Sequence, residues 1–138
     1  MFIAVDFDGT IVKHRYPDIG EEIPFAIETL KLIQTELKHN LILWTVREGE
    51  LLEEAVEFCW SKGLTFYAIN QNHPDSSTII SPRKLMADMF IDDRNFGGLP
   101  DWGLIYNILK NKPSDCLNAS IFNNIPIAEK PKKRGFFR

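Results

Sequence analysis

The chain opens with a short apolar stretch, Met1–Ala4, that runs directly into Val5-Asp6-Phe7-Asp8-Gly9-Thr10. This order predicts a buried strand that ends in two carboxylates two residues apart, followed by a glycine turn and a hydroxyl group. In an open α/β sheet, ligands bind at the carboxyl ends of the strands. Two acids at such an end suit Mg²⁺ binding, and they also suit attack on phosphorus combined with proton transfer. A plain polar turn is the alternative, since Asp-Gly is a common turn pair.

The rest of the chain alternates between segments of strand length and helix length. Strands are predicted over 2–7, 41–45, 64–69 and 89–91, and helices over about 24–39, 48–62 and 101–111, with a short helical turn over 84–87. This alternation indicates βαβ units and a parallel sheet, and right-handed crossovers then place helices on both faces. The predicted fold class is α/β, with a three-layer, Rossmann-like arrangement.

The composition is that of an ordinary globular protein. Of the 138 residues, 44% are hydrophobic and 25% are charged, and the net charge of −3 gives no support for nucleic-acid binding over the whole chain. No apolar run is long enough to span a bilayer, and no basic segment precedes Asp6 as in a signal peptide. Cys59 and Cys116 are too few for a disulfide scaffold or metal cluster, which favours a cytoplasmic protein with reduced thiols.

Polar side chains follow three of the predicted strands. Asp6 and Asp8 follow the first strand, Thr45 ends the second, and Asp92 and Asp93 follow the fourth. If the first strand lies between the other two, these groups converge at one edge of the sheet. Four carboxylates in one place repel each other unless a cation neutralises them, and Mg²⁺ is the natural choice because it prefers oxygen ligands.

In this order, the residues resemble the four motifs of the haloacid dehalogenase-like (HAD) superfamily. The motifs are Asp-Phe-Asp-Gly-Thr at residues 6–10, the strand ending in Thr45, a lysine before the fourth strand, and Asp92-Asp93 at its end. The match covers about residues 1–111. The resemblance implies the HAD fold and a Mg²⁺-dependent phosphatase, a hydrolase of phosphate monoesters that works through an aspartyl-phosphate.

The resemblance also implies a role for each matching residue. Asp6 would be the nucleophile and a metal ligand. Asp8 would be the general acid and base, oriented by Thr10, and would bind Mg²⁺ through its backbone carbonyl. Thr45 would hold the phosphoryl oxygens.

The later motifs would supply charge and metal ligands. Lys84 would bind the phosphate and neutralise charge on it, although Arg83 and Lys62 compete for this role. Asp93 would be the direct metal ligand and Asp92 its support, in an order that is open to reversal.

Arg47 follows Thr45 closely, so it is a candidate for contact with substrate. The alternative for Arg47 is the solvated start of a helix. The histidines His14, His39 and His73 show no metal-ligand spacing, and surface positions are expected for them.

The connections over 8–22 and 70–81 are too short to hold a folded domain, so no cap domain is expected. The segment Lys13–Tyr16 is either a small flap or a solvated loop. We place the catalytic domain at 1–112 and a partly irregular, basic tail at 113–138. The tail is either a disordered terminus or a segment that packs over an open site, in its own subunit or a neighbour's.

Other activities remain open beside the hydrolase. A phosphotransferase and a non-catalytic phosphate- or metal-binding module are both compatible with the residues. A signalling receiver is disfavoured, because the third predicted strand ends in Ile69-Asn70 without an acid. The expected partner is a phosphorylated substrate of undefined type, and a homo-oligomer is compatible with the chain.

Overall fold

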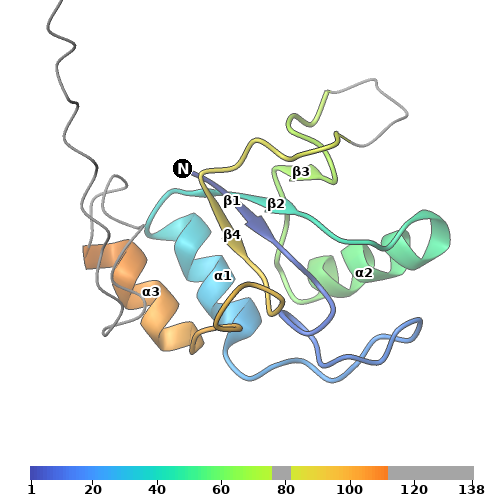
Figure 1. Cartoon of the computed structure of the whole chain (residues 1–138), viewed down its shortest axis with the longest axis horizontal. Helices are drawn as coiled ribbons and strands as arrows, with labels where there is room; N and C mark the ends of the chain where they lie inside the picture. Colours follow the sequence, from blue (N-terminus) through green and yellow to red (C-terminus); the bar gives the residue numbers. More distant parts are fainter. Residues whose placement is uncertain (76–81, 112–138) are drawn as a thin grey trace, which may run out of the picture.

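The computed structural model describes residues 1–75 and 82–111. The tail predicted over 113–138 lies outside the described residues, as does part of the connection over 70–81. The strands are β1 (Phe2–Val5), β2 (Asn40–Leu43), β3 (Ala68–Ile69) and β4 (Met89–Ile91), and the helices are α1 (Ala26–Thr35), α2 (Gly49–Ser61) and α3 (Trp102–Asn111) (Figure 1).

The strands form a parallel sheet in the order β3-β2-β1-β4. β1 therefore lies between β2 and β4, as the predicted convergence of their polar ends requires. Val5 is level with Leu43 of β2 and with Ile91 of β4. The chain thus leaves three adjacent strands at the same edge of the sheet, and the α/β class with a parallel sheet is confirmed.

The core lies between the sheet and the helices. Ile3 and Val5 point to one face of β1 because side chains alternate along a strand. Apolar residues at helical spacing meet them there from all three helices. The buried side chains of this core include Leu30, Ile33, Ala55, Cys59, Trp102, Ile105 and Leu109.

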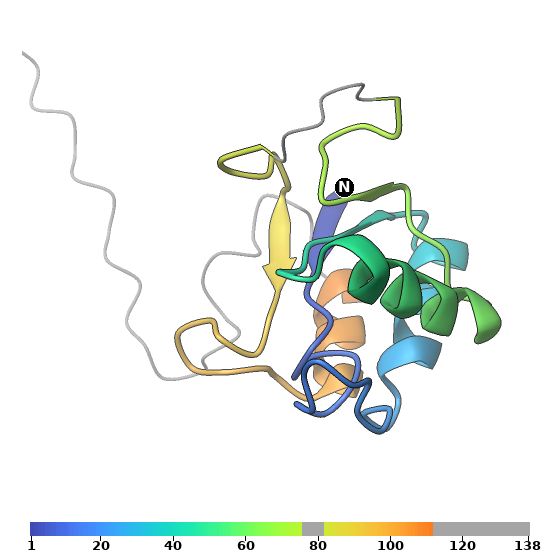
Figure 2. The same ribbon diagram turned by 90° about the vertical axis from the view of Figure 1, so that its right-hand side faces the viewer.

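The distribution of the helices differs from the sequence prediction. α1, α2 and α3 all contribute to the core on the face of Ile3 and Val5, and α1 and α2 lie on the same side of the sheet in Figure 2. On the opposite face, Leu85 packs with Ala4 and Ile42. In the described part of the β3–β4 connection, this loop packing takes the place of the helical layer that was expected there.

The predicted turn over 84–87 is not helical in the structure. The Met86 N–H donates to Asn72 Oδ1 at 2.7 Å, and the Asp88 N–H donates to the Phe2 carbonyl at 2.8 Å. Because Met86 donates to a loop residue and Asp88 donates to β1, these N–H groups do not form the hydrogen bonds of a local helix.

The connections from β1 to α1 and from β3 to β4 are too short to hold a separate domain, so neither of them contains a cap domain. None of the described helices has the length and apolarity that crossing a bilayer requires.

Candidate active site

Three carboxylates meet at the carboxyl edge of the sheet. Asp6 follows β1, and Asp92 and Asp93 follow the adjacent β4. One ligand oxygen from each of the three lies within 4.8 Å of the others. The structure therefore brings together the acids that the sequence predicts at strand ends.

Burial and the two neighbouring carboxylates make Asp6 a weaker acid. Burial is the main cause that raises the pKa of Asp6 from 3.8 to about 7, and the nearby charges of Asp92 and Asp93 raise it further. Hydrogen bonds from the Phe7 N–H and from the Thr10 hydroxyl, at 3.3 Å, act in the opposite direction. A carboxylate in this setting favours either a proton or a cation.

A pH dependence of stability follows for the metal-free protein. Because the folded-state pKa of Asp6 is about 7 and its ordinary value is 3.8, the folded state holds a proton that the unfolded state releases between these values. Stability should therefore fall as the pH rises through this window. Urea unfolding in chelator at about pH 5 and about pH 8 should show a larger fall for wild type than for Asp6→Asn. Equal falls in both proteins would contradict the raised pKa.

Asp93 offers an oxygen that is buried and unpartnered. Its Oδ2 lies 2.8 Å from His14 Nε2, and its N–H donates to Thr10 Oγ1 at 3.1 Å. In the described structure its Oδ1 is buried without a hydrogen-bond partner. A buried carboxylate oxygen destabilises the folded state unless a hydrogen-bond donor or a cation satisfies it. With two further carboxylates beside it, this oxygen fits a divalent cation with oxygen ligands.

Gly9 makes the close approach of Asp93 possible. Its φ of +89° lies in the region that favours glycine, and a Cβ there would collide with Asp93 Oδ2 and His14 Nε2. The glycine in the first motif is therefore required by the packing of the acidic cluster as well as by the turn.

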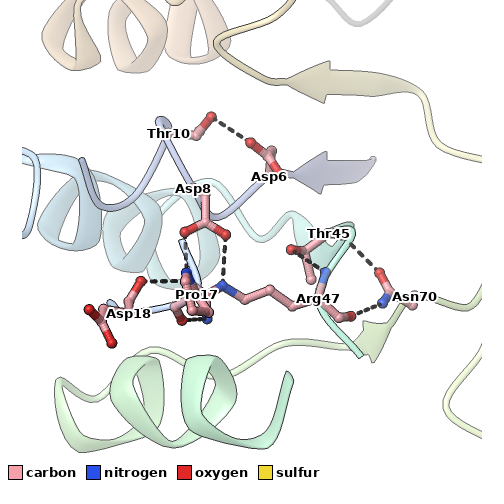
Figure 3. A network of polar contacts seen from close by, with 8 residues as sticks. All are labelled: Asp6, Asp8, Thr10, Pro17, Asp18, Thr45, Arg47 and Asn70. Atoms are coloured by element: carbon pink, nitrogen blue, oxygen red, sulfur yellow. Dashed lines mark hydrogen bonds and ion pairs between the residues drawn. The ribbon is translucent and has the colours of Figure 1, made fainter. Parts of the chain in front are cut away.

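Asp8 lies at the same edge of the sheet as the three acids, but its carboxylate is paired. Its Oδ2 accepts from Arg47 Nε and its Oδ1 accepts from Arg47 Nη2, both at 2.7 Å. Figure 3 shows that Asp8 points toward Arg47 whereas Asp6 points toward Thr10. Asp8 must leave Arg47 before it can exchange a proton with a substrate.

The contact predicted between Arg47 and substrate is not what the structure shows. Arg47 is fully buried, with an exposure of 0%, and its guanidinium is bonded to Asp8 and to loop carbonyls. The hydrogen bonds to Asp8 raise the pKa of Arg47, so this side chain is a permanent buried cation.

Thr45 lies at the same edge of the sheet as the acids, as the sequence predicts. Its N–H donates to Asn70 Oδ1 at 2.8 Å, and its Oγ1 accepts from the Arg47 N–H at 3.2 Å. Asn70 Nδ2 in turn donates to the Arg47 carbonyl at 3.4 Å (Figure 3). Asn70 thus fixes the turn after β2, a role that sequence reasoning missed because no spacing pattern marks a bond between two loops.

A cavity of about 270 Å³ opens at this edge of the sheet. Arg94 is the cation on its wall, and Trp44 and Val46 add apolar surface. Its lining residues are Asp6, Asp8, Trp44, Thr45, Val46, Asp92 and Arg94.

The structure does not bring Lys84 to this cavity. Lys84 is exposed and lines a separate hollow with Phe2 and Asp88, at the amino ends of β1 and β4. The segment 82–88 reaches that end because Asp88 must enter β4 in parallel with β1. Arg94 and His14, which sequence reasoning did not place in the site, are the basic side chains beside the acidic cluster.

Comparison with known proteins gives one strong similarity. The chain is 66% identical to a conserved protein of Bacteroides thetaiotaomicron whose structure is solved, over 82% of this chain and 92% of that one, with a TM-score of 0.76. No protein-family model matches the chain, and a search of curated proteins finds no match either. At this identity and coverage, the chain belongs to the same family as the Bacteroides protein.

Proposed function

We propose that this chain is a Mg²⁺-dependent phosphomonoester hydrolase of the HAD type that works through an aspartyl-phosphate on Asp6. The observation that carries the proposal is the cluster of Asp6, Asp92 and Asp93 at the carboxyl edge of a parallel sheet. The unpartnered oxygen of Asp93 and the raised pKa of Asp6 both favour a cation at this place. The order of the motifs along the chain supports the same family.

The metal would be held by the side chains of Asp6 and Asp93 and by the backbone carbonyl of Asp8, with Asp92 in support. When bound, Mg²⁺ would neutralise part of the negative charge that the phosphate and the carboxylates bring together. Arg94 adds a second positive charge on the cavity wall. Thr45, which follows β2 and lines the cavity, would hold a phosphoryl oxygen.

The reaction then runs in two steps. An oxygen of Asp6 attacks phosphorus, the bond from phosphorus to the leaving oxygen breaks, and Asp8 gives that oxygen a proton. Water next attacks phosphorus and gives a proton to Asp8, and the bond from phosphorus to Asp6 breaks. Inorganic phosphate leaves, and both carboxyl groups return to their first states.

The position of Arg94 leads to a test against Lys84. Because Arg94 lines the cavity and Lys84 does not, Arg94→Ala should lower kcat/KM by about tenfold or more, and Lys84→Ala should leave it nearly unchanged. Steady-state kinetics on the same substrate would measure both. If Lys84→Ala proves the more damaging, the lysine of the HAD motif acts in the site after all and Arg94 does not replace it.

A non-catalytic module that binds metal and phosphate is the second candidate. The pairing of both Asp8 oxygens with Arg47 favours it, because a held Asp8 cannot transfer protons. Such a module would bind Mg²⁺ and inorganic phosphate in calorimetry but would release no phosphate from any ester.

The test of the proposal is a screen of phosphorylated metabolites and phosphorylated polymer ends with Mg²⁺, measured by phosphate release. Asp6→Asn in parallel identifies any contaminating phosphatase. Turnover in the wild type that Asp6→Asn lacks supports the hydrolase. Binding without turnover across the screen would favour the module.

The proposal includes a cytoplasmic location. The chain has only two cysteines, and Cys59 is a free thiol buried in the core. Burial raises the pKa of Cys59 to about 12, so this thiol is an inert core residue. Free thiols are typical of proteins in reducing compartments.

A further inference from the structure

We infer that Arg47 is a positioning residue that couples the loop Lys13–Gly20 to Asp8, so that the loop and the carboxylate are held or released together. The coupling itself is independent of any activity. Its consequence for catalysis rests on the proposed function, in which Asp8 transfers the protons.

The loop is closed tightly at its base. The Lys13 N–H donates to the Glu21 carbonyl at 2.8 Å, and Lys13 Nζ lies 2.8 Å from Glu21 Oε2. Gly20 is buried at the same point, where a Cβ would collide with the Lys13 carbonyl. The base of the loop is therefore held without Arg47. The tip of the loop, residues 16–18, is the part that Arg47 contacts and can control.

The tip of the loop is bonded to the guanidinium. Arg47 Nη1 donates to the Pro17 carbonyl at 2.9 Å, and Nη2 donates to the Asp18 carbonyl at 2.8 Å. The guanidinium carbon also lies 5.2 Å from the centre of the Tyr16 ring. These residues are themselves exposed, and the buried guanidinium of Arg47 gives them an anchor inside the protein.

The same guanidinium holds Asp8 in a two-pronged ion pair (Figure 3). The planar fork of an arginine can make all four hydrogen bonds to Asp8 and the loop carbonyls at once, whereas the ammonium of a lysine has only three donors. If either side moves, donors of a fully buried cation lose their partners, which is strongly unfavourable. The position of Asp8 and the position of the tip are therefore linked through one side chain.

Trypsin cleavage after Arg15 in the full chain tests the coupling, because its rate follows the population of open loop. We expect Asp8→Asn and Arg47→Lys each to raise this rate by about tenfold or more, since each breaks a buried charged pair. The double variant should be cleaved no faster than the faster single variant, because both changes break the same link. Arg83→Lys, a change at an exposed arginine, should leave the rate unchanged.

Cleavage after Lys31 in α1 reports global unfolding and separates it from loop opening. If Arg47→Lys raises the rates of cleavage after Arg15 and after Lys31 equally, that variant unfolds globally. The Asp8→Asn variant alone then tests the coupling. Wild-type cleavage after Arg15 in a folded Asp8→Asn protein would overturn the coupling. Additive effects of the two substitutions on the rate of cleavage after Arg15 in the double variant would overturn the coupling as well.

Two substrates that differ in their leaving group test whether the coupling affects proton transfer by Asp8. An alkyl phosphate needs a proton on its leaving oxygen, whereas p-nitrophenyl phosphate releases a stable anion. Because Asp8 can transfer a proton only after it leaves Arg47, Arg47→Lys should raise kcat/KM for the alkyl ester about tenfold relative to kcat/KM for the nitrophenyl ester. An unchanged ratio of the two kcat/KM values would show that Arg47 does not act through Asp8. A wild-type protein that hydrolyses neither ester would refute the proposed function, while the trypsin result would still decide the coupling.

Discussion

Asp6→Asn is expected to lower kcat for phosphate esters by at least about a thousandfold, because an amide oxygen cannot take over nucleophilic attack on phosphorus. The substitution keeps the size of the side chain, and it removes a charge from a cluster where burial and two neighbouring acids already raise the pKa of Asp6. The folded state should therefore survive the change. Phosphate release under saturating Mg²⁺ measures the loss, and thermal unfolding checks the fold.

Asp75→Asn is the matched control for this prediction. Asp75 is an exposed carboxylate outside the cavity, so the same chemical change there should leave kcat unchanged. Substantial turnover by a folded Asp6→Asn protein, freed of contaminating phosphatase, would exclude Asp6 as the nucleophile.

The convergence of the acids was predictable because it depends on topology. Parallel strands bring their carboxyl ends to one edge, and the level register of Val5, Leu43 and Ile91 then sets Asp6 beside Asp92. Thr45, two residues beyond Leu43, lines the same cavity. Alternating apolar segments are enough to predict such a sheet. The part of the site that strand ends determine was therefore within reach of the sequence.

The partners of those acids were not predictable in the same way. Arg47 was expected at the substrate, yet it is buried because Asp8 and two loop carbonyls of residues 17–18 meet it from distant parts of the chain. Lys84 was expected at the phosphate, yet its segment runs to the amino ends of the strands. Both outcomes depend on how loops fold back, which residue spacing does not encode.

The missing helical layer has a similar cause. The β3–β4 connection was expected to cross the sheet with a helical turn, but Met86 and Asp88 give their N–H groups to Asn72 and Phe2. Leu85 covers Ala4 and Ile42 without any helix in the described part of this connection. Tertiary hydrogen bonds here override the local pattern of residues 84–87.

Removal of Mg²⁺ is expected to abolish phosphate release, and adding it back should restore the full rate. The three carboxylates around one point repel each other without a cation, and the buried oxygen of Asp93 has no other partner in the described structure. Activity titrated with Mg²⁺ after chelation measures the requirement. Full activity of the chelated protein would refute a metal-dependent mechanism.

The two adjacent acids should differ in their effect on metal affinity. Asp92 Oδ1 already accepts the Arg94 N–H at 2.8 Å, which fixes a turn, whereas Asp93 Oδ1 is unpartnered. Changing a residue that only orients a ligand typically weakens metal binding about 10–100-fold, so Asp93→Asn, which removes a direct ligand, should cost at least as much. Asp92→Asn should cost less than Asp93→Asn. Calorimetric titration of each folded variant with Mg²⁺ measures this without any need for turnover. The reverse order would make Asp92 the direct ligand and Asp93 its support, because removing the direct ligand should weaken Mg²⁺ binding more than removing the residue that orients it.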